Sequence, residues 1–258
     1  MTAQKIKRLV DYLFIDEDLL RRYTEQIRDQ FAQVEETSLS VSASLAGPKV
    51  EASRRKRRKE LNSSERIDLL NVCLDVTKDI ALSRPPAYLE PFGEDVPRFV
   101  RETTTASKVI IPAPALESVK GLSSFAIWVS DPDPSVYSKK DYVWSGTFLY
   151  LTEMHWDTLP FRSTFSGCSA LQAIVNASLG KELVSYQEQD TWEPFGRGSH
   201  DHPIEKLKRL GATVSDKRRI ETLYRTRFMT NEQCYVFNHE ERRVNDLLAY
   251  PIYIAAAD

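Results

Sequence analysis

Apolar residues recur every three or four positions in the first helix that the sequence predicts. Asp16 is a suitable N-cap, and the acidic Glu17 and Asp18 follow it in the first turn. The apolar positions are Leu19, Leu20, Tyr23, Ile27, Phe31 and Val34. Charged residues take the other face, so the pattern predicts an amphipathic helix that packs against a core or a partner helix. An alternating, aromatic stretch at residues 10–15 predicts a short strand before it.

The period changes from helical to strictly alternating at residues 38–45, which read SLSVSASL. Apolar residues then point to one side and serines to the other, as in a half-buried strand. Gly47 and Pro48 provide turn chemistry, and residues 49–59 can return as a second strand. We therefore expect a β-hairpin here. A disordered linker is the alternative, because segments rich in Ser, Lys and Arg bury little apolar surface.

A second helix is predicted from Ser64 to about residue 82, and a proline-rich connector follows it. Pro85, Pro86, Pro91 and Pro97 make residues 84–98 an extended segment. We place a boundary there, which divides the chain into an N-terminal helix-hairpin-helix region (1–83), the connector (84–98) and a second domain (99–258).

The pattern beyond the connector predicts a sheet with helices packed on it. Strands are expected at residues 108–111, 124–130, 147–152, 234–237 and 250–255, and helices at 168–179, 203–210 and 217–229. Pro203 fits the first helical position and Gly211 the residue after the helix, while Pro251 suggests an edge strand or a strand start. The fold class is α+β with a mixed or antiparallel sheet.

The composition limits the classes of protein to which this chain can belong. The 258 residues are 41% hydrophobic and 28% charged, with a net charge of −2. The three cysteines lie far apart without C-x-x-C spacing, which argues against a disulfide framework and a structural zinc site and favours the cytoplasm. No signal peptide or transmembrane stretch is expected. Asp131 and Asp133 could ligate a metal, but the turn sequence DPDP explains them without one, so no metal and no cofactor are predicted.

One cysteine, Cys168, lies at a position that suits a catalytic nucleophile. Cys168 stands in SGCSA at the start of a predicted helix, where the helix dipole lowers a thiol pKa. His200 and His202 in GRGSHDHP are the candidate bases. The order of Cys and His, together with GCSAL, resembles papain-like hydrolases. The alternative is a cysteine that fills a gap between helix and sheet, so whether the chain is an enzyme stays open.

Cations gather in two places. The first is an unbroken run, Arg54, Arg55, Lys56, Arg57, Arg58 and Lys59. Such density attracts phosphates by counterion release, although a solvated basic linker would look the same. The second is Arg218, Arg219 and Arg225 on the helix predicted for residues 217–229, where ordinary ion pairs are the alternative. Nucleic acid or an acidic partner is the expected ligand of these groups.

The N-terminal motif YLFIDEDLLRRYTEQI, followed by the Ser-rich alternation and GPKVEAS, resembles an uncharacterised family of bacterial cytosolic proteins. The resemblance covers about the first 65 residues. It implies an accessory gene of mobile or phage-defence islands and assigns no catalytic residue. Our leading hypothesis is a soluble nucleic-acid-binding protein. The alternatives are a Cys168-dependent hydrolase and a scaffold or regulatory subunit that binds a protein partner or its own copy.

Overall fold

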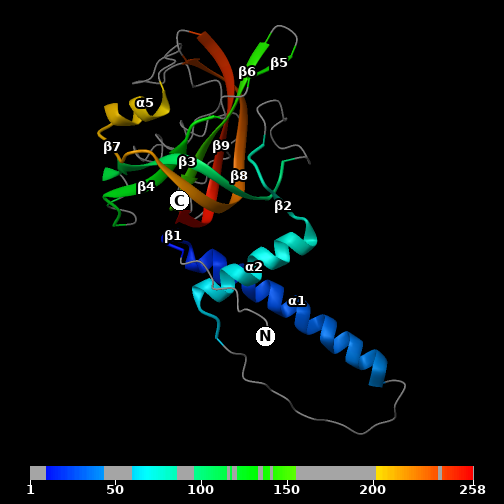
Figure 1. The fold of residues 1–258 in the computed structure, drawn as a ribbon. Helices are drawn as coiled ribbons and strands as arrows, with labels where there is room; N and C mark the ends of the chain where they lie inside the picture. The colour runs from blue at the N-terminus through cyan, green and yellow to red at the C-terminus, as the bar shows by residue number, and fades with distance from the viewer. Residues whose placement is uncertain are drawn as a thin grey trace, which may run out of the picture. The chain divides into compact units, whose positions relative to one another are not determined.

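The computed structural model describes residues 10–43, 60–85, 96–114, 117, 121–132, 136–139, 142–154, 202–237 and 240–257. The chain divides into two compact units. The helical unit is Ile15–Asp79, and the barrel unit combines Met1–Phe14 with Ile80–Asp258. The helical unit is therefore an insertion within the sequence of the barrel unit. Figure 1 shows the elements of both units. The described residues of the expected connector, which are 84, 85 and 96–98, belong to the barrel unit.

The helical unit contains α1 (Glu17–Ala43) and α2 (Ser63–Thr77). The backbone N–H of Leu19 donates to the Asp16 carboxylate at 2.8 Å, which confirms Asp16 as the cap of α1. Asn62 caps α2 in a reciprocal capping box with Glu65. Lys78, with φ 59°, ends α2 in a left-handed conformation. The two helices therefore begin at groups that satisfy their first backbone donors.

Two predictions for this unit were wrong. Residues 38–43 were expected to form a strand but continue α1, which ends at Ala43. Extending an existing helix adds one hydrogen bond for each residue fixed, whereas a strand needs a partner to pair with. The return strand at 49–59 lies outside the described residues. The second helix was expected to reach residue 82, but Ile80 and Ala81 form β2 and pair with β3.

The barrel unit contains one helix and nine strands among its described residues. The elements are β1 (Tyr12–Ile15), β2 (Ile80–Ala81), β3 (Phe99–Pro112), β4 (Ser124–Ser130), β5 (Val136–Lys139), β6 (Tyr142–Thr152), α5 (Pro203–Arg209), β7 (Thr213–Val214), β8 (Arg218–Phe237) and β9 (Glu240–Ala256). These elements confirm the α+β class, with a mixed sheet.

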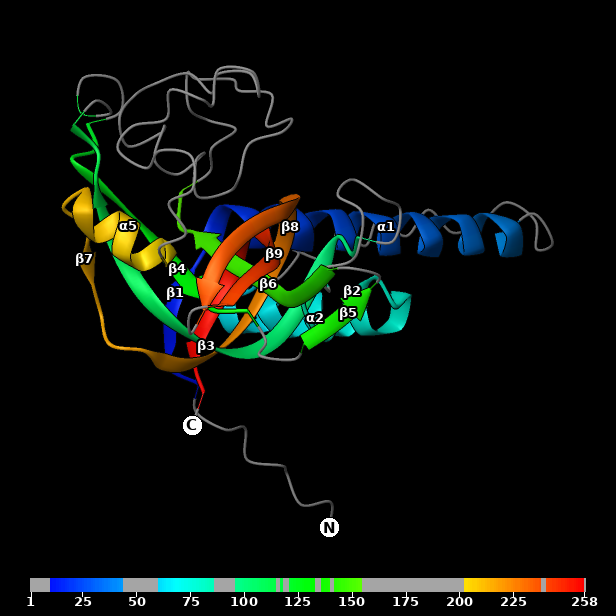
Figure 2. The same ribbon diagram turned by 90° about the horizontal axis from the view of Figure 1, so that it is seen from above.

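Five of the strands form a closed circuit of hydrogen-bonded pairs. In the order β3-β4-β6-β9-β8, each strand pairs with the next, and β8 returns to β3. The β6–β9 pair is parallel and the other four are antiparallel. Within this circuit β3 pairs with two strands, since residues 99–106 pair with β8 and residues 106–112 pair with β4. The result is a small barrel, in which β8 and β9 run side by side in both views (Figures 1 and 2).

Side chains from all five strands fill the barrel interior. Val100, Ala106, Trp128, Leu149, Leu151, Ile220, Tyr224, Leu247, Ala249 and Ile254 form one buried cluster. Because side chains alternate between the two faces of a strand, the residues between these positions face outward. β9 is buried from residue 244 to 255, so its outward side is covered there as well. This agrees with the continuous apolar and aromatic run at residues 247–256, next to which Asn245 and Asp246 are also buried.

Several strand and helix predictions are confirmed. β4 covers residues 124–130 as expected, and the strands predicted at 108–111, 147–152, 234–237 and 250–255 lie within β3, β6, β8 and β9. α5 has Pro203 in its first turn and Gly211 at φ 85° just beyond its end. The predicted helix at 168–179 lies outside the described residues.

The helix predicted at residues 217–229 was wrong, because residues 218–229 are part of β8. Ile220, Thr222 and Tyr224 occupy alternate positions and are buried, as is Leu223 on the opposite side of the strand. β-branched and aromatic residues at period two favour a strand. Pro251 was also misplaced, since it lies inside β9. It faces Tyr224 beside a register shift, where a missing backbone donor is tolerated.

Among the described residues, no helix has both the length and the apolar composition needed to cross a bilayer.

The burial pattern predicts a sharp contrast in stability effect between buried and exposed strand positions. Leu247→Ala removes a fully buried side chain, so we expect a loss of about 2–5 kcal/mol in the free energy of unfolding. Thr103→Ala, at an exposed position of β3, should change it by less than about 0.5 kcal/mol. Urea denaturation monitored by tryptophan fluorescence measures both. Equal losses for the two variants would contradict the assignment of Leu247 to the core.

Candidate functional site

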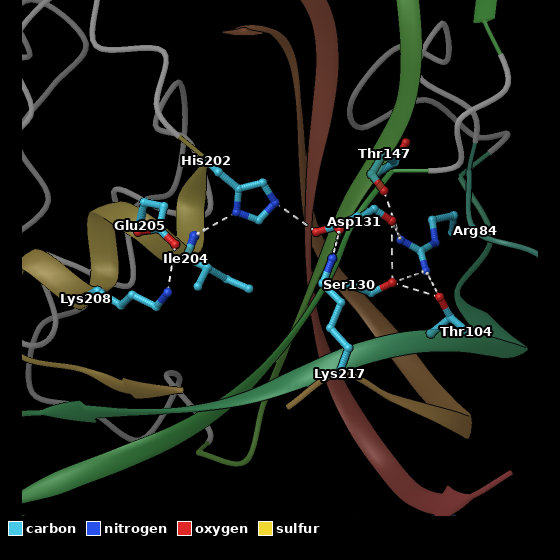
Figure 3. Close-up of polar contacts among 10 residues, drawn as sticks. All are labelled: Arg84, Thr104, Ser130, Asp131, Thr147, His202, Ile204, Glu205, Lys208 and Lys217. Carbon is cyan, nitrogen blue, oxygen red and sulfur yellow. Dashed lines mark hydrogen bonds and ion pairs between the residues drawn. The ribbon is translucent and has the colours of Figure 1, made fainter. Parts of the chain in front are cut away.

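Arg84 is the centre of a polar network between β2, β3, β4 and β6. A guanidinium group has five N–H donors, and each of the five is used here. Figure 3 shows four of the acceptors, which converge on Arg84 from three strands or their ends. The bonds run from Nε to Glu102 Oε2 (3.2 Å), from Nη1 to the carbonyl oxygens of Asp131 (3.1 Å) and Thr147 (3.0 Å), and from Nη2 to the hydroxyls of Thr104 (2.7 Å) and Ser130 (2.8 Å).

The charge of Arg84 is balanced by Glu102. Their side chains are only 10% and 9% exposed, so this is a largely buried ion pair. The other Glu102 oxygen accepts a hydrogen bond from the Tyr224 hydroxyl at 2.9 Å. Burial, and then the Glu102 charge, raise the pKa of Tyr224 well above its ordinary value of 10.0. Tyr224 therefore stays a neutral donor, and the network is held together inside the barrel.

Asp131 carries the second cluster, just beyond the end of β4. Its Oδ1 lies 2.9 Å from His202 Nε2, and its Oδ2 lies 2.5 Å from Lys217 Nζ (Figure 3). The hydrogen bond from His202, followed by that from Lys217, lowers the pKa of the Asp131 carboxyl from 3.8 to about 2, while partial burial opposes the shift. The Asp131 side chain is 36% exposed, so solvent screens this cluster far more than it screens Arg84.

His202 joins α5 to this carboxylate. Its Nδ1 accepts a hydrogen bond from the Ile204 N–H at 3.2 Å, which makes His202 the N-cap of α5. A ring nitrogen that accepts has no proton, so Nε2 is the nitrogen that donates to Asp131. The His202 and Phe148 rings also pack in a T-shaped arrangement, with the ring centroids 5.5 Å apart. Both ring nitrogens are therefore engaged in holding α5 in place.

The hydrogen bonds of His202 affect its predicted role as a general base. A general base needs an available lone pair within reach of the proton it removes. In His202 that lone pair already accepts from Ile204. Cys168 and His200, the other two residues of the hydrolase hypothesis, lie outside the described residues, as does the run Arg54–Lys59.

Arg218, Arg219 and Arg225 are all described, and the structure places them on a strand. Direct partners across β3 and β8 are Arg218 with Ala106, Arg219 with Thr105 and Arg225 with Phe99. Arg218 and Arg219 are neighbours on β8, so they point to opposite sides of the sheet. The three arginines therefore do not form the single face that a helix was expected to give them.

Sequence reasoning missed Arg84, and it considered Asp131 as a metal ligand but explained it as a turn residue. A lone arginine before Pro85 belongs to no periodic pattern in the sequence. Its five acceptors come from segments far away in the sequence, so no local signal identifies them. The DPDP turn indicates that Asp131 follows the end of a strand, but it does not predict the contacts of Asp131 with His202 or Lys217. Within the described residues, no three His, Cys, Asp or Glu side chains are grouped as a metal ion would need.

Comparison of the chain with models of protein families, with curated proteins and with solved structures found no match.

Replacing Arg84 by Lys should destabilise the protein strongly. Lys keeps the charge but has three donors without the planar fork, so at least two buried acceptors lose their bonds. We expect a loss of about 2–4 kcal/mol in the free energy of unfolding. Arg21→Lys is the matched control, because Arg21 forms an exposed ion pair with Asp18 and should cost less than about 0.5 kcal/mol. Equal effects of the two substitutions would rule out the central role of Arg84.

The lowered pKa of Asp131 predicts a pH dependence. A carboxyl group that is more acidic in the folded state stabilises the fold above its unfolded pKa, here 3.8, and loses that effect as pH falls towards about 2. The stability difference between the wild-type protein and Asp131→Asn should therefore shrink below pH 4. Carbon NMR of the Asp131 carboxyl should give a midpoint near 2. A midpoint near 4 in the folded protein would show that the contacts with His202 and Lys217 do not persist in solution.

Proposed function

We propose that this chain binds nucleic acid through the phosphate backbone. The observation that carries the proposal is the run of six cations at residues 54–59 in a chain whose net charge is only −2. Cations at such density bind phosphates by releasing condensed counterions, which gives affinity without sequence preference. Aromatic residues are absent from the run, so stacking of bases on it is not part of the proposal.

The connectivity of the barrel gives independent support. Numbered along the chain, its five strands are β3, β4, β6, β8 and β9, and they pair in the order 1-2-3-5-4-1. The third and fifth strands are parallel, and a helix, α5, lies between the third and fourth strands in the sequence. This is the connectivity of OB-fold barrels, many of which bind oligonucleotides or oligosaccharides. The support is an analogy of fold, since one fold hosts many functions.

The remaining parts of the proposal rest on the N-terminal resemblance. It suggests a cytoplasmic bacterial accessory protein, and phage defence as its setting. The hydrolase alternative has less support, because the lone pair of His202 is engaged by Ile204. A scaffold or regulatory subunit is the alternative that applies if the protein binds no nucleic acid.

A salt-dependent titration tests the proposal. Wild-type protein should bind short DNA and RNA, single-stranded and duplex, with an affinity that falls steeply between about 50 and 200 mM salt. Replacing residues 54–59 by Gln and Ser should weaken binding and reduce the slope of log K against log salt. The reduction should reach about 0.7 for each lost contact on single strands.

The control variant neutralises Arg21, Arg22, Lys208 and Arg209, four exposed cations elsewhere in the chain. Per charge removed, it should reduce the slope much less than the 54–59 variant does. If wild-type protein binds none of the four probes at about 50 mM salt, the proposed function is wrong. Equal reductions per charge in the two variants would mean that residues 54–59 have no special part in binding.

A further inference from the structure

The three helices in the described part of the chain begin at three different kinds of cap. The Asp16 carboxylate accepts from the first turn of α1 and the Asn62 amide oxygen from that of α2, whereas a ring nitrogen of His202 caps α5. A carboxylate stays ionised above about pH 5 and an amide does not titrate, but an imidazole changes its charge between about pH 5 and 8. The cap of α5 is therefore the one that can change near neutral pH.

The cap of α5 requires a neutral imidazole ring. His202 Nδ1 accepts the Ile204 N–H at 3.2 Å, which is possible only while Nδ1 carries no proton. The proton of the neutral ring then lies on Nε2, which donates to Asp131 Oδ1 at 2.9 Å (Figure 3). A second proton makes both ring nitrogens donors. The new N–H on Nδ1 then faces the N–H of Ile204 with no acceptor between them, so the cap is lost.

The Asp131 carboxylate can hold the protonated ring as well as the neutral one. The hydrogen bond from His202, followed by that from Lys217, lowers the pKa of Asp131 to about 2, so this carboxylate is ionised wherever an imidazole titrates. A hydrogen bond between an imidazolium and a carboxylate is charge-assisted and stronger than one from a neutral ring. Protonation therefore strengthens the bond of His202 to the end of β4 and removes its bond to the start of α5.

Charged groups from three parts of the fold surround the His202 ring. Asp131 lies just after β4, and Lys217, just before β8, forms an ion pair with it. Glu205 lies in the first turn of α5, where the hydrogen bond from Lys208 and, to a smaller extent, the charge of His202 lower the pKa of Glu205. Carboxylates and lysine ammonium groups keep their charges between about pH 5 and 8. The imidazole is therefore the group of this cluster that changes its charge in that range.

The start of α5 depends strongly on its cap. A helix of seven residues gains few internal hydrogen bonds, and its first N–H groups have no acceptor within the helix. Ile204 and Leu207 are buried, and the His202 ring packs on Phe148 of β6. A change at His202 is thus felt where α5 meets the barrel.

We propose that His202 is a pH-dependent switch at the start of α5. The neutral ring joins α5 to the end of β4. The protonated ring stays with Asp131 and releases the first turn of α5. This switch is separate from the proposed function, and its test needs no nucleic acid.

NMR spectroscopy of the full-length protein between about pH 5 and 8 tests the switch. The nitrogen-15 shifts of the His202 ring give its neutral tautomer and the midpoint of its titration. As the ring becomes protonated, the hydrogen-exchange protection factor of the Ile204 amide should fall about fivefold, which corresponds to the loss of an N-cap. The Glu65 amide is the internal control, because it donates to the Asn62 side chain and should keep its protection.

Two variants separate the switch from a general effect of pH on the barrel. His202→Asn provides a cap that does not titrate, so the protection of the Ile204 amide should no longer depend on pH. His202→Ala provides no cap, so the protection should be low at both ends of the range. The proposal is wrong if the neutral ring carries its proton on Nδ1, or if wild-type protection does not change as the ring titrates. The same pH dependence in His202→Asn as in the wild-type protein would also overturn it.

Discussion

The buried Arg84–Glu102 pair is the interaction on which the barrel unit depends. Taking a guanidinium group out of water is costly, and its electrostatic attraction to one carboxylate offsets that cost only when every other donor is also bonded. Here the remaining four donors reach two hydroxyls and two backbone carbonyl groups on separate strands. Arg84 therefore specifies the mutual positions of β3, β4 and β6 as well as neutralising Glu102. An apolar side chain in its place would remove these bonds and leave only the mutual hydrogen bond of the Thr104 and Ser130 hydroxyls, at 2.7 Å, among the four acceptors.

The same network connects the core with the Asp131 cluster. Arg84 holds the backbone carbonyl of Asp131, and the Asp131 carboxylate holds His202 and Lys217. The start of α5 and the start of β8 are thereby both fixed at the end of β4. Because β8 begins there, this cluster also sets where Arg218 and Arg219 enter the ladder with β3. The polar cluster is thus better explained as a means of positioning than as a centre of chemistry.

Local signals in the sequence correctly predicted those helices and strands whose bounds are set by neighbouring residues. Asp16 and Pro203 gave the starts of two helices, and the apolar run of residues 125–129 between two serines gave β4 with its bounds. The wrong predictions concern segments whose secondary structure depends on contacts with distant parts of the chain. The serine alternation of 38–43 looks like a strand but continues a helix, because a sheet partner is what a strand requires. The arginine-rich stretch at 217–229 contains good helix formers, yet pairing with β3 and β9 makes it a strand. Arg84 could not be predicted at all, since its importance arises only when three strands are assembled.

The insertion of the helical unit has a consequence for the order of folding. β1 lies next to β9 in the sheet, and the Ala256 N–H donates to the Asp11 carbonyl at 2.8 Å, so segments about as far apart as this chain allows must meet. During synthesis, α1 and α2 can pair as soon as both have left the ribosome, whereas the barrel has to wait for residues 240–256. β1 must then remain without β9 until residues 240–256 have been synthesised. The inserted helices follow β1 directly in the sequence, and we infer that they act as an early-folding segment beside a strand that finds its partner last.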